Sequence, residues 1–150
     1  MKTHLNHLFI LGLLVALLAA CAPARIPITG ANSVQIENPF TPQTGDGTFV
    51  KDTVRFVKAE VSKMDGAPSK FGLKLSFFLP TPCDQYRVTV GQPGADNRIN
   101  VEVYSLMVKD KPCTLMALST PTEASLTLGN LAAGHYTVWV NGEKATEFNA

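Results

Sequence analysis

The sequence predicts an all-β domain, an antiparallel sandwich of about seven strands. Apolar and polar residues alternate in seven separate segments after residue 52, which is the pattern of strands with one buried face. No segment after residue 20 has the 3.6-residue period of an amphipathic helix. Asn141-Gly142 separates the last two segments and favours a β-hairpin, because both residues tolerate positive φ. The expected strands lie within residues 53–62, 70–79, 85–90, 98–108, 123–128, 136–140 and 143–148.

The chain opens with a pattern typical of a secretory signal. Residues 1–7 are polar with one firm positive charge, Lys2, and residues 8–20 are 13 consecutive apolar residues. That length fits the apolar region of a signal peptide, whereas a transmembrane helix needs roughly 20 residues. The run ends in Leu18-Ala19-Ala20-Cys21, which resembles the lipobox of bacterial lipoproteins. The alternative interpretation is an ordinary signal peptide, residues 1–20, with a chance cysteine at the cleavage site.

The lipobox resemblance implies a lipid anchor on Cys21. In that family the cysteine thiol receives a diacylglyceryl group, the signal peptide is cleaved before it, and the new amino group usually receives a fatty acyl chain such as palmitate. Two or more acyl chains hold a protein stably at a membrane, whereas one chain does so only marginally. Ala22 stands where an aspartate commonly retains such proteins at the inner membrane. We therefore expect the protein at the bacterial cell envelope, facing outside the cytoplasm, at the outer membrane if the organism has two membranes.

Residues 21–52 are expected to form a tether between the lipid and a domain of residues 53–150. A flexible chain of about 30 residues has a root-mean-square reach on the order of 30 Å. Val34 and Ile36 alternate with polar neighbours, so a short strand is the alternative at this point. The segment is rich in residues that interrupt regular structure, namely Pro23, Pro27, Gly30, Pro39, Pro42, Gly45 and Gly47.

Composition and charge exclude some classes of function. Removal of residues 1–20 leaves twelve Lys and Arg residues against twelve Asp and Glu, and a single histidine, His135. Without a basic excess the mature chain has little charge with which to bind DNA or RNA, so no nucleic-acid partner is expected. About 130 residues are enough to bury one sizeable core, which favours one domain.

The alternation changes parity at two places, which predicts irregular strands. Between Phe56 and Val57 the apolar positions change face, so a bulge or a switch between sheets is expected there. After Tyr104 the apolar positions shift to Leu106, which predicts a second bulge. The clearest inward face is that of Phe71, Leu73, Leu75, Phe77 and Leu79.

The last hairpin places one aromatic side chain on the outer face of its sheet. Core-facing positions start at Tyr136 and alternate, so Trp139 lies on the opposite face. A two-residue turn puts Lys144 across from Trp139 and Phe148 across from His135. A one-residue bulge instead moves Phe148 to the side of Tyr136.

Residues 131–140 resemble the corner followed by a strand near the end of immunoglobulin-like and fibronectin-like domains. There a tyrosine at the strand start hydrogen-bonds back to the preceding loop, which implies this role for Tyr136. The chain also resembles small secreted bacterial domains with a Leu-Pro-x-x-Cys stretch, a second cysteine about thirty residues on, and a terminal Gly-x-Tyr-x-Val-x-Val-Asn-Gly hairpin. Here these are residues 79–83, Cys113 and residues 134–142. The resemblance implies an Ig-like sandwich and no particular activity, and the Cys–Trp–Cys spacing of antibody domains is missing.

Cys83 and Cys113 are expected to form a disulfide. They remain as an even pair once Cys21 carries lipid, and the envelope is an oxidising compartment. Both lie beside a proline at a strand end, where two chains can approach the Cα separation of about 4.4–6.8 Å that a disulfide needs. The alternative is a metal site, for which two thiols without a nearby histidine are a poor ligand set. We expect no metal and no cofactor.

The sequence shows little that could support catalysis, and we predict that the domain is not an enzyme. A hydrolase triad needs a base, and the mature chain offers only His135, without a Gly-x-Ser-x-Gly motif. Paired carboxylates could cleave glycosides, but four glutamates fall on outward strand positions or in turns: Glu102, Glu123, Glu143 and Glu147.

These observations predict a binding or structural module at the envelope, with an envelope protein or a glycan as partner. An outward Trp139 suits stacking on a sugar ring or contact with a protein, unless the tether or a neighbouring side chain covers it. Two more specific hypotheses are a carbohydrate- or cell-wall-binding module that uses Trp139, and an inhibitor of an envelope hydrolase that presents the loop of residues 92–97.

Overall fold

The computed structural model of the chain describes residues 35–66, 68–109, 113 and 119–150. They belong to one compact unit, residues 33–150. The predicted signal peptide and the lipidation site Cys21 lie outside the described residues. No helix in the described part of the chain has both the length and the apolar character needed to cross a bilayer.

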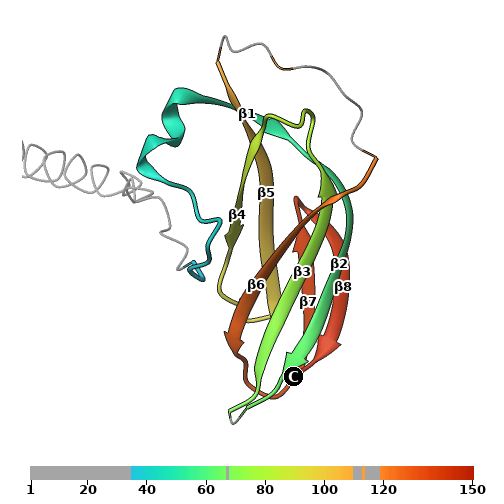
Figure 1. The fold of residues 1–150 in the computed structure, drawn as a ribbon. Helices are drawn as coiled ribbons and strands as arrows, with labels where there is room; N and C mark the ends of the chain where they lie inside the picture. The colour runs from blue at the N-terminus through green and yellow to red at the C-terminus, as the bar shows by residue number, and fades with distance from the viewer. Residues whose placement is uncertain (1–34, 67, 110–112, 114–118) are drawn as a thin grey trace, which may run out of the picture. The chain divides into compact units, whose positions relative to one another are not determined.

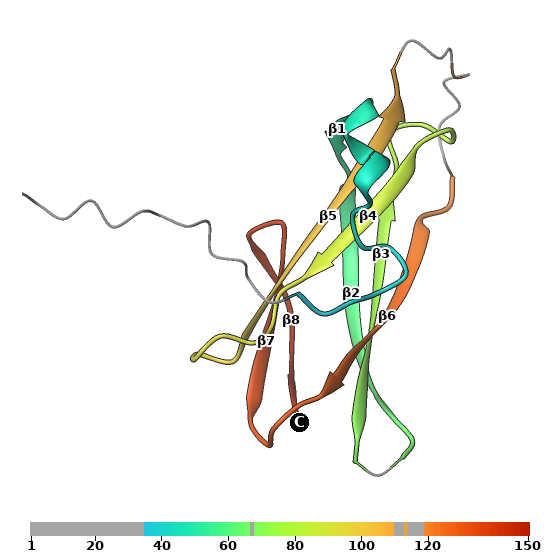
Figure 2. The same cartoon turned by 90° about the vertical axis from the view of Figure 1, so that its left-hand side faces the viewer.

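Eight strands form two sheets packed face to face, so the predicted all-β sandwich is confirmed (Figure 1). Figure 2 shows the two layers from the side. One sheet has the order β2-β3-β6, and the other contains β1, β4, β5, β7 and β8. The strands are β1 Phe49–Thr53, β2 Arg55–Met64, β3 Lys70–Phe78, β4 Gln85–Val90, β5 Arg98–Val108, β6 Thr122–Asn130, β7 His135–Val140 and β8 Glu143–Asn149.

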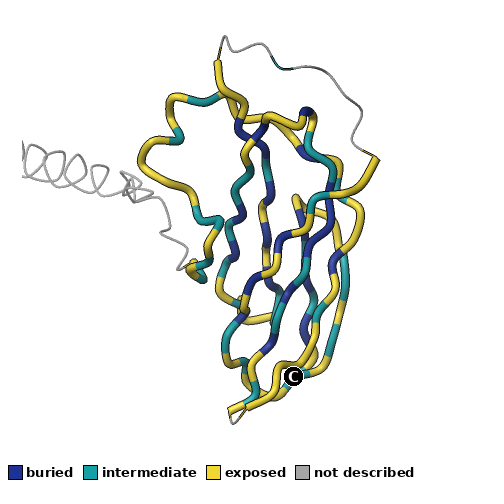
Figure 3. Tube along the Cα trace, in the orientation of Figure 1, coloured by how far each residue is buried: buried dark blue, intermediate teal, exposed yellow. Residues whose placement is uncertain are grey.

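The core lies between the two sheets and is built from alternating strand positions. Buried residues alternate with more exposed ones along the strands that form most of the core, β3 to β7, as the colours in Figure 3 show. Phe71, Leu73, Leu75 and Phe77 of β3 are all buried, as their spacing predicts. The ring of Phe77 meets Tyr86 of β4 edge to face, with 5.1 Å between ring centroids, and so joins the two sheets.

Strand β5 is the centre of the larger sheet and has different neighbours on its two edges. Strand β4 pairs with residues 101–106 of β5 along one edge. Along the other edge, β1 pairs antiparallel with residues 104–108 and β7 pairs parallel with residues 98–101. The sequence predicts an antiparallel sandwich, so the parallel β5–β7 pair is a difference. Strands β1 and β7 thus share one edge of β5 but run in opposite directions along it.

The gap between β1 and β7 on this edge is filled by a single side chain. Val103 presents its backbone groups to the gap, where no strand lies beside it. Its N–H donates to Oδ1 of Asn141 at 2.9 Å, and its carbonyl accepts from Nδ2 of Asn141 at 3.0 Å. The backbone N–H of Asn141 also donates to the carbonyl of Val101 at 2.9 Å. The Asn141 side chain therefore continues the ladder in place of a strand.

Residues 35–53, most of which the sequence assigned to the tether, lie on the sandwich. Ile36 donates its N–H to the carbonyl of Val90 at 2.7 Å, and the carbonyl of Phe40 accepts from the N–H of Val88 at 2.9 Å. This segment covers the free edge of β4, and its two apolar side chains pack on the core. A 3₁₀-helix, η2 Thr44–Thr48, and strand β1 follow. The domain therefore includes residues well before the expected boundary at 53.

One of the two predicted bulges is present. The register of β2 against β3 shifts between Phe56 and Lys58, and the extra residue, Val57, is exposed. Strand β5 pairs with β1 over residues 104–108 and with β4 over residues 101–106, and neither pairing has a register shift. The parity there is unbroken because Ser105 occupies the inward position and is buried, while Leu106 is buried on the opposite face.

The last hairpin combines both registers that the sequence left open. Val140 pairs with Glu143 across a two-residue turn, and Trp139 pairs with Lys144. A register shift between Val138 and Trp139 then brings Phe148 opposite Tyr136. Their rings stack with 5.5 Å between centroids. The hydroxyl of Tyr136 donates to the carbonyl of Ala132 in the preceding loop at 3.0 Å, as the resemblance implies.

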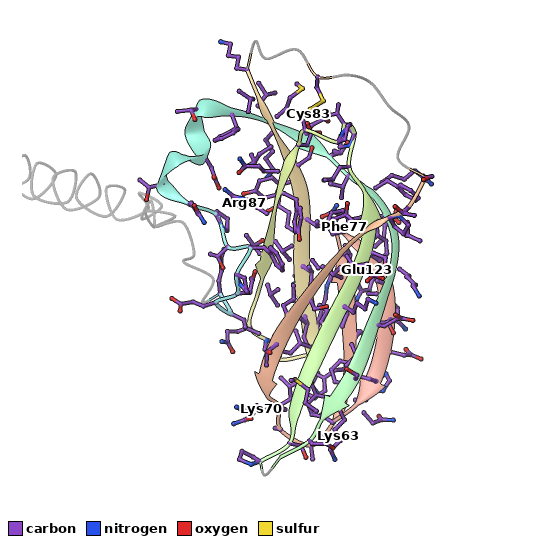
Figure 4. The ribbon with its side chains drawn as sticks, in the orientation of Figure 1. Lys63, Lys70, Phe77, Cys83, Arg87 and Glu123 are labelled. Carbon is purple, nitrogen blue, oxygen red and sulfur yellow. A yellow bond between two sulfur atoms is a disulfide. The ribbon has the colours of Figure 1, made fainter. Side chains whose placement is uncertain are left out.

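The predicted disulfide is confirmed. Cys83 and Cys113 are bonded, with 6.1 Å between their Cα atoms, at one rim of the sandwich (Figure 4). The bond links the β3–β4 corner to the chain that follows β5. A buried carboxylate shapes this corner, because Asp84 accepts hydrogen bonds from the hydroxyl of Thr81 at 2.7 Å and from its N–H at 3.2 Å.

Candidate ligand-binding groove

An open groove of about 970 Å³ lies over β5, on the outer face of the larger sheet. Its floor is the β5 segment from Asn100 to Tyr104. One wall is Lys51–Thr53 of β1, and the opposite wall includes Thr89 and residues 91–92 at the end of β4, with Gln35. The turn Asn141-Gly142 completes the lining. The volume is within the range of small-molecule binding sites, about 300–1,000 Å³.

The strand alternation determines which side chains face the groove. Ile99, Val101 and Val103 are buried in the core, so the outer face of β5 carries Asn100, Glu102 and Tyr104. Asn100 and Glu102 are exposed, and Tyr104 is half-buried. The three side chains follow one another along a single line of the sheet.

A lysine from β1 joins two of these floor residues. Nζ of Lys51 lies 2.5 Å from Oε1 of Glu102 and 3.9 Å from the ring centroid of Tyr104. Asp52 adds a second carboxylate to the lining, so the charged residues of the groove carry one excess negative charge. Burial raises the pKa of the Tyr104 phenol, which therefore stays neutral at physiological pH.

Trp139 lies beside one end of the groove, on the same face of the sheet. It pairs with Asn100 across the β5–β7 ladder and is half-buried. The guanidinium of Arg98 lies 3.9 Å from the centroid of its ring, and its indole N–H donates to the hydroxyl of Thr137 at 3.2 Å. Arg98 in turn donates to Oδ1 of Asn100 at 2.7 Å. A neighbouring side chain therefore covers one face of Trp139, which is one of the two predicted alternatives.

An ion pair holds η2 against the outer face beyond the other end of the groove. Arg87 of β4, which pairs with Tyr104, donates from Nε and a terminal nitrogen to the two carboxylate oxygens of Asp46, at 2.9 and 2.8 Å. The side chains are only 12% and 14% exposed. The hydrogen bond from Arg87 lowers the pKa of Asp46, so the pair is fully charged at neutral pH. Figure 4 shows Arg87 on the side of β4 that faces η2.

The structure places His135 away from the groove, on the exposed β7–β8 ladder. Its Nδ1 lies 3.2 Å from Oδ1 of Asn149, and its Nε2 lies 3.6 Å from a carboxylate oxygen of Glu147. Among the described residues, no group of three or more His, Cys, Asp and Glu side chains could hold a metal ion. The four glutamates predicted to point outward, Glu102, Glu123, Glu143 and Glu147, are all exposed. Of these four, Glu102 alone lines the groove.

Sequence reasoning named Trp139 and missed the groove beside it. The outward positions of the segment 98–104 carried the available signal, because an amide, a carboxylate and a phenol follow one another there. The walls come from segments far apart in the chain, and no local pattern marks them.

The described residues form a small β-sandwich domain with a disulfide at one rim and an open groove on one sheet. The family model of the ORF11 beta-sandwich domain matches residues 73–150. This is more than half of the chain, and the chain belongs to that family. The match begins within β3 and includes all of β4 to β8. No curated protein and no solved structure matches the chain significantly.

Proposed function

We propose that the protein is a lipoprotein of the bacterial cell envelope whose sandwich is a non-catalytic binding module. The groove over β5 is the observation that carries the binding role, because it is open, amphipathic and preformed. The anchor rests on the order of features at the N-terminus, in which an apolar run of signal-peptide length ends in Leu18-Ala19-Ala20-Cys21.

The state of the charged groups in the groove supports binding over catalysis. Glu102 is ion-paired with Lys51, and Asp52 accepts a hydrogen bond from the N–H of Thr53 at 2.7 Å. A general base must be free to take up a proton from a substrate, and both carboxylates here are exposed to solvent and already engaged by a cation or a backbone N–H. The histidine of the mature chain contacts Asn149 and Glu147 on a different part of the sheet.

The proposal gives the module two kinds of partner. The lipid on Cys21 binds the membrane, and the groove binds an envelope protein or a glycan. A nucleic acid is not a partner, since the groove has an excess of negative charge and the mature chain has no basic excess.

Fractionation and mass spectrometry of the intact protein test the anchor. Wild-type protein should be membrane-bound and heavier than the chain from residue 21 by its acyl groups, whereas Cys21→Ala should be released or left unprocessed. Ala22→Ser leaves the lipobox intact and is the matched control. An unmodified Cys21 in mature wild-type protein would end the lipoprotein assignment.

Crosslinking in the intact envelope tests the binding role. A photoreactive amino acid at Thr89, in the groove wall, should form an adduct of defined mass, because a bound partner covers this position. The same group at Ser125, exposed on the outer face of β6, is the control. Absence of any adduct at Thr89, or equal adducts at both positions, would contradict a binding role for the groove.

A further inference from the structure

We propose that the groove binds a neutral oligosaccharide, laid along β5 from Asn100 to Tyr104. The inference rests on the proposed function, since it names the ligand class of the same groove. It follows from three properties of the lining: its charge, the state of its backbone groups, and the chemistry of its free side chains.

The charge of the lining disfavours an anionic ligand. The one cation in the lining, Lys51, is already paired with Glu102 at 2.5 Å, and Asp52 adds a negative charge beside them. A phosphate, an acidic peptide or an acidic polysaccharide would have to displace Glu102 from the lysine. A neutral ligand has no such cost.

The backbone of the floor leaves no edge to which a peptide strand could add. Strand β4 occupies one edge of β5, and β1 and β7 share the other. The remaining position, Val103, uses both its N–H and its carbonyl in hydrogen bonds to Asn141. Strand addition needs a row of unpaired N–H and carbonyl groups, and the floor of the groove does not offer one.

The side chains of the lining supply the groups that a hydroxyl-rich ligand needs. Within the described part of the chain, the Thr89 hydroxyl, the Gln92 amide and the NH₂ group of Asn100 make no hydrogen bond, and all three residues line the groove. An amide or hydroxyl can donate and accept, as can each sugar hydroxyl. The groove thus offers several mixed donor and acceptor groups with little net charge.

The floor ends in an aromatic ring, Tyr104, and a second aromatic ring, Trp139, lies beside the opposite end of the floor at Asn100. Tyr104 is half-buried with one charged contact, to Lys51, and Trp139 lies next to Asn100. Aromatic rings offer the flat apolar surface on which the C–H face of a sugar ring stacks. A cation lies over one face of each ring, Lys51 over Tyr104 and Arg98 over Trp139, so a stacked sugar displaces that side chain or uses the opposite face. The four-residue step from Asn100 to Tyr104 covers about 13 Å along the strand, so more than one sugar ring fits between the two aromatics.

The test uses detergent-solubilised full-length protein and a panel of soluble oligosaccharides. The neutral arm contains N-acetylglucosamine oligomers, which represent the cell wall, and neutral hexose oligomers, which represent surface polysaccharides. Heparin fragments form the acidic arm. Trp139 is the only tryptophan of the chain, so its fluorescence reports a ligand seated next to Asn100. We expect saturable binding of a member of the neutral arm, and whichever oligomer binds identifies the source of the glycan.

Paired variants assign the binding to the groove. Asn100→Ala and Thr89→Val each remove a free hydrogen-bonding group and should weaken binding roughly threefold to tenfold. Ser125→Ala and Thr127→Val on the outer face of β6 are the matched controls and should bind as wild type. The melting temperature of each variant shows that it is folded.

Three results would overturn the inference. They are no binding of any neutral oligosaccharide, equal binding of the acidic arm, and affinity that the groove variants leave unchanged. The lipid analysis of Cys21 and the crosslinking at Thr89 decide the proposed function separately, so an envelope protein found at Thr89 without glycan binding would retain the binding role and refute the oligosaccharide.

Discussion

Replacing Asn141 tests whether one side chain stands in for a missing piece of strand. Asn141→Gly removes the amide that bonds both backbone groups of Val103. Glycine accepts the positive φ of this position, 50°, so the backbone of the turn can stay as it is. The variant therefore isolates the side-chain hydrogen bonds from the conformational preference of the turn.

The expected loss follows from the two hydrogen bonds. Each hydrogen bond contributes about 1 kcal/mol to the free energy of unfolding. The N–H and C=O groups of Val103 also lose their partner and incur part of their desolvation cost, so the total loss of stability should be about 2–3 kcal/mol. For a domain of this size that corresponds to a fall in melting temperature of roughly 8–12 °C. Asn141→Asp keeps the acceptor for the N–H but sets a carboxylate against the Val103 carbonyl, and should also destabilise the domain.

Thermal and urea denaturation followed by circular dichroism measure the effect. Asn97→Gly is the matched control, because Asn97 also has a positive φ, 55°, and its side chain makes no hydrogen bond within the described residues. The control should stay within about 0.5 kcal/mol of wild type. If both variants lose the same stability, the bonds to Val103 contribute nothing and the reasoning fails.

Two further predictions concern other contacts. Replacing both Cys83 and Cys113 by serine removes a bond between residues separated by 30 positions and should lower the free energy of unfolding by roughly 3–4 kcal/mol. The melting temperature of the variant should be lower than that of wild type and should not change when a reductant is added. Free thiols at both positions in the native protein would contradict the bond. Asp46→Asn should lower stability at neutral pH. The pKa of Asp46 is lowered in the folded state, so the ionised carboxylate stabilises the fold above the ordinary aspartate pKa of about 3.9. As the pH falls from there through the folded-state pKa, this stabilisation is lost, and the difference between variant and wild type should shrink. Asp65→Asn, on an exposed turn, is the control, and a difference that does not change with pH would argue against the ion pair.

The faces of the strands were predictable because burial on a sheet repeats every two residues. The buried run of β3 and the outward position of Trp139 follow from this rule alone. Strand β1 escaped it, since Val50 to Thr53 are all exposed and show no alternation. The second bulge was predicted wrongly for a different reason: Ser105 is polar at a buried position, so the apolar pattern is interrupted although the strand is continuous.

The groove could not be predicted, because its walls depend on pairing between distant segments. Gln35, Thr53, Gly91 and Asn141 meet only because β1, β4 and the last hairpin all lie against β5. The cover on Trp139 has the same cause. Arg98 reaches its ring through the parallel β5–β7 pair, and alternation does not specify whether two strands run parallel.

The attachment of Gln35 beside the groove sets how far the binding surface can lie from the membrane in the proposed lipoprotein. Gln35 pairs with Gly91 and lines the groove, so the tether to the lipid can extend no further than Gln35. Fourteen residue steps separate Cys21 from Gln35. Fully extended, these steps cover at most about 50 Å, less than half of the reach of the predicted tether up to residue 52. A ligand whose distance from the bilayer exceeds the combined length of this tether and the domain is out of reach. The groove would then meet its ligands by lateral diffusion of the lipid along the membrane, within a thin layer next to it.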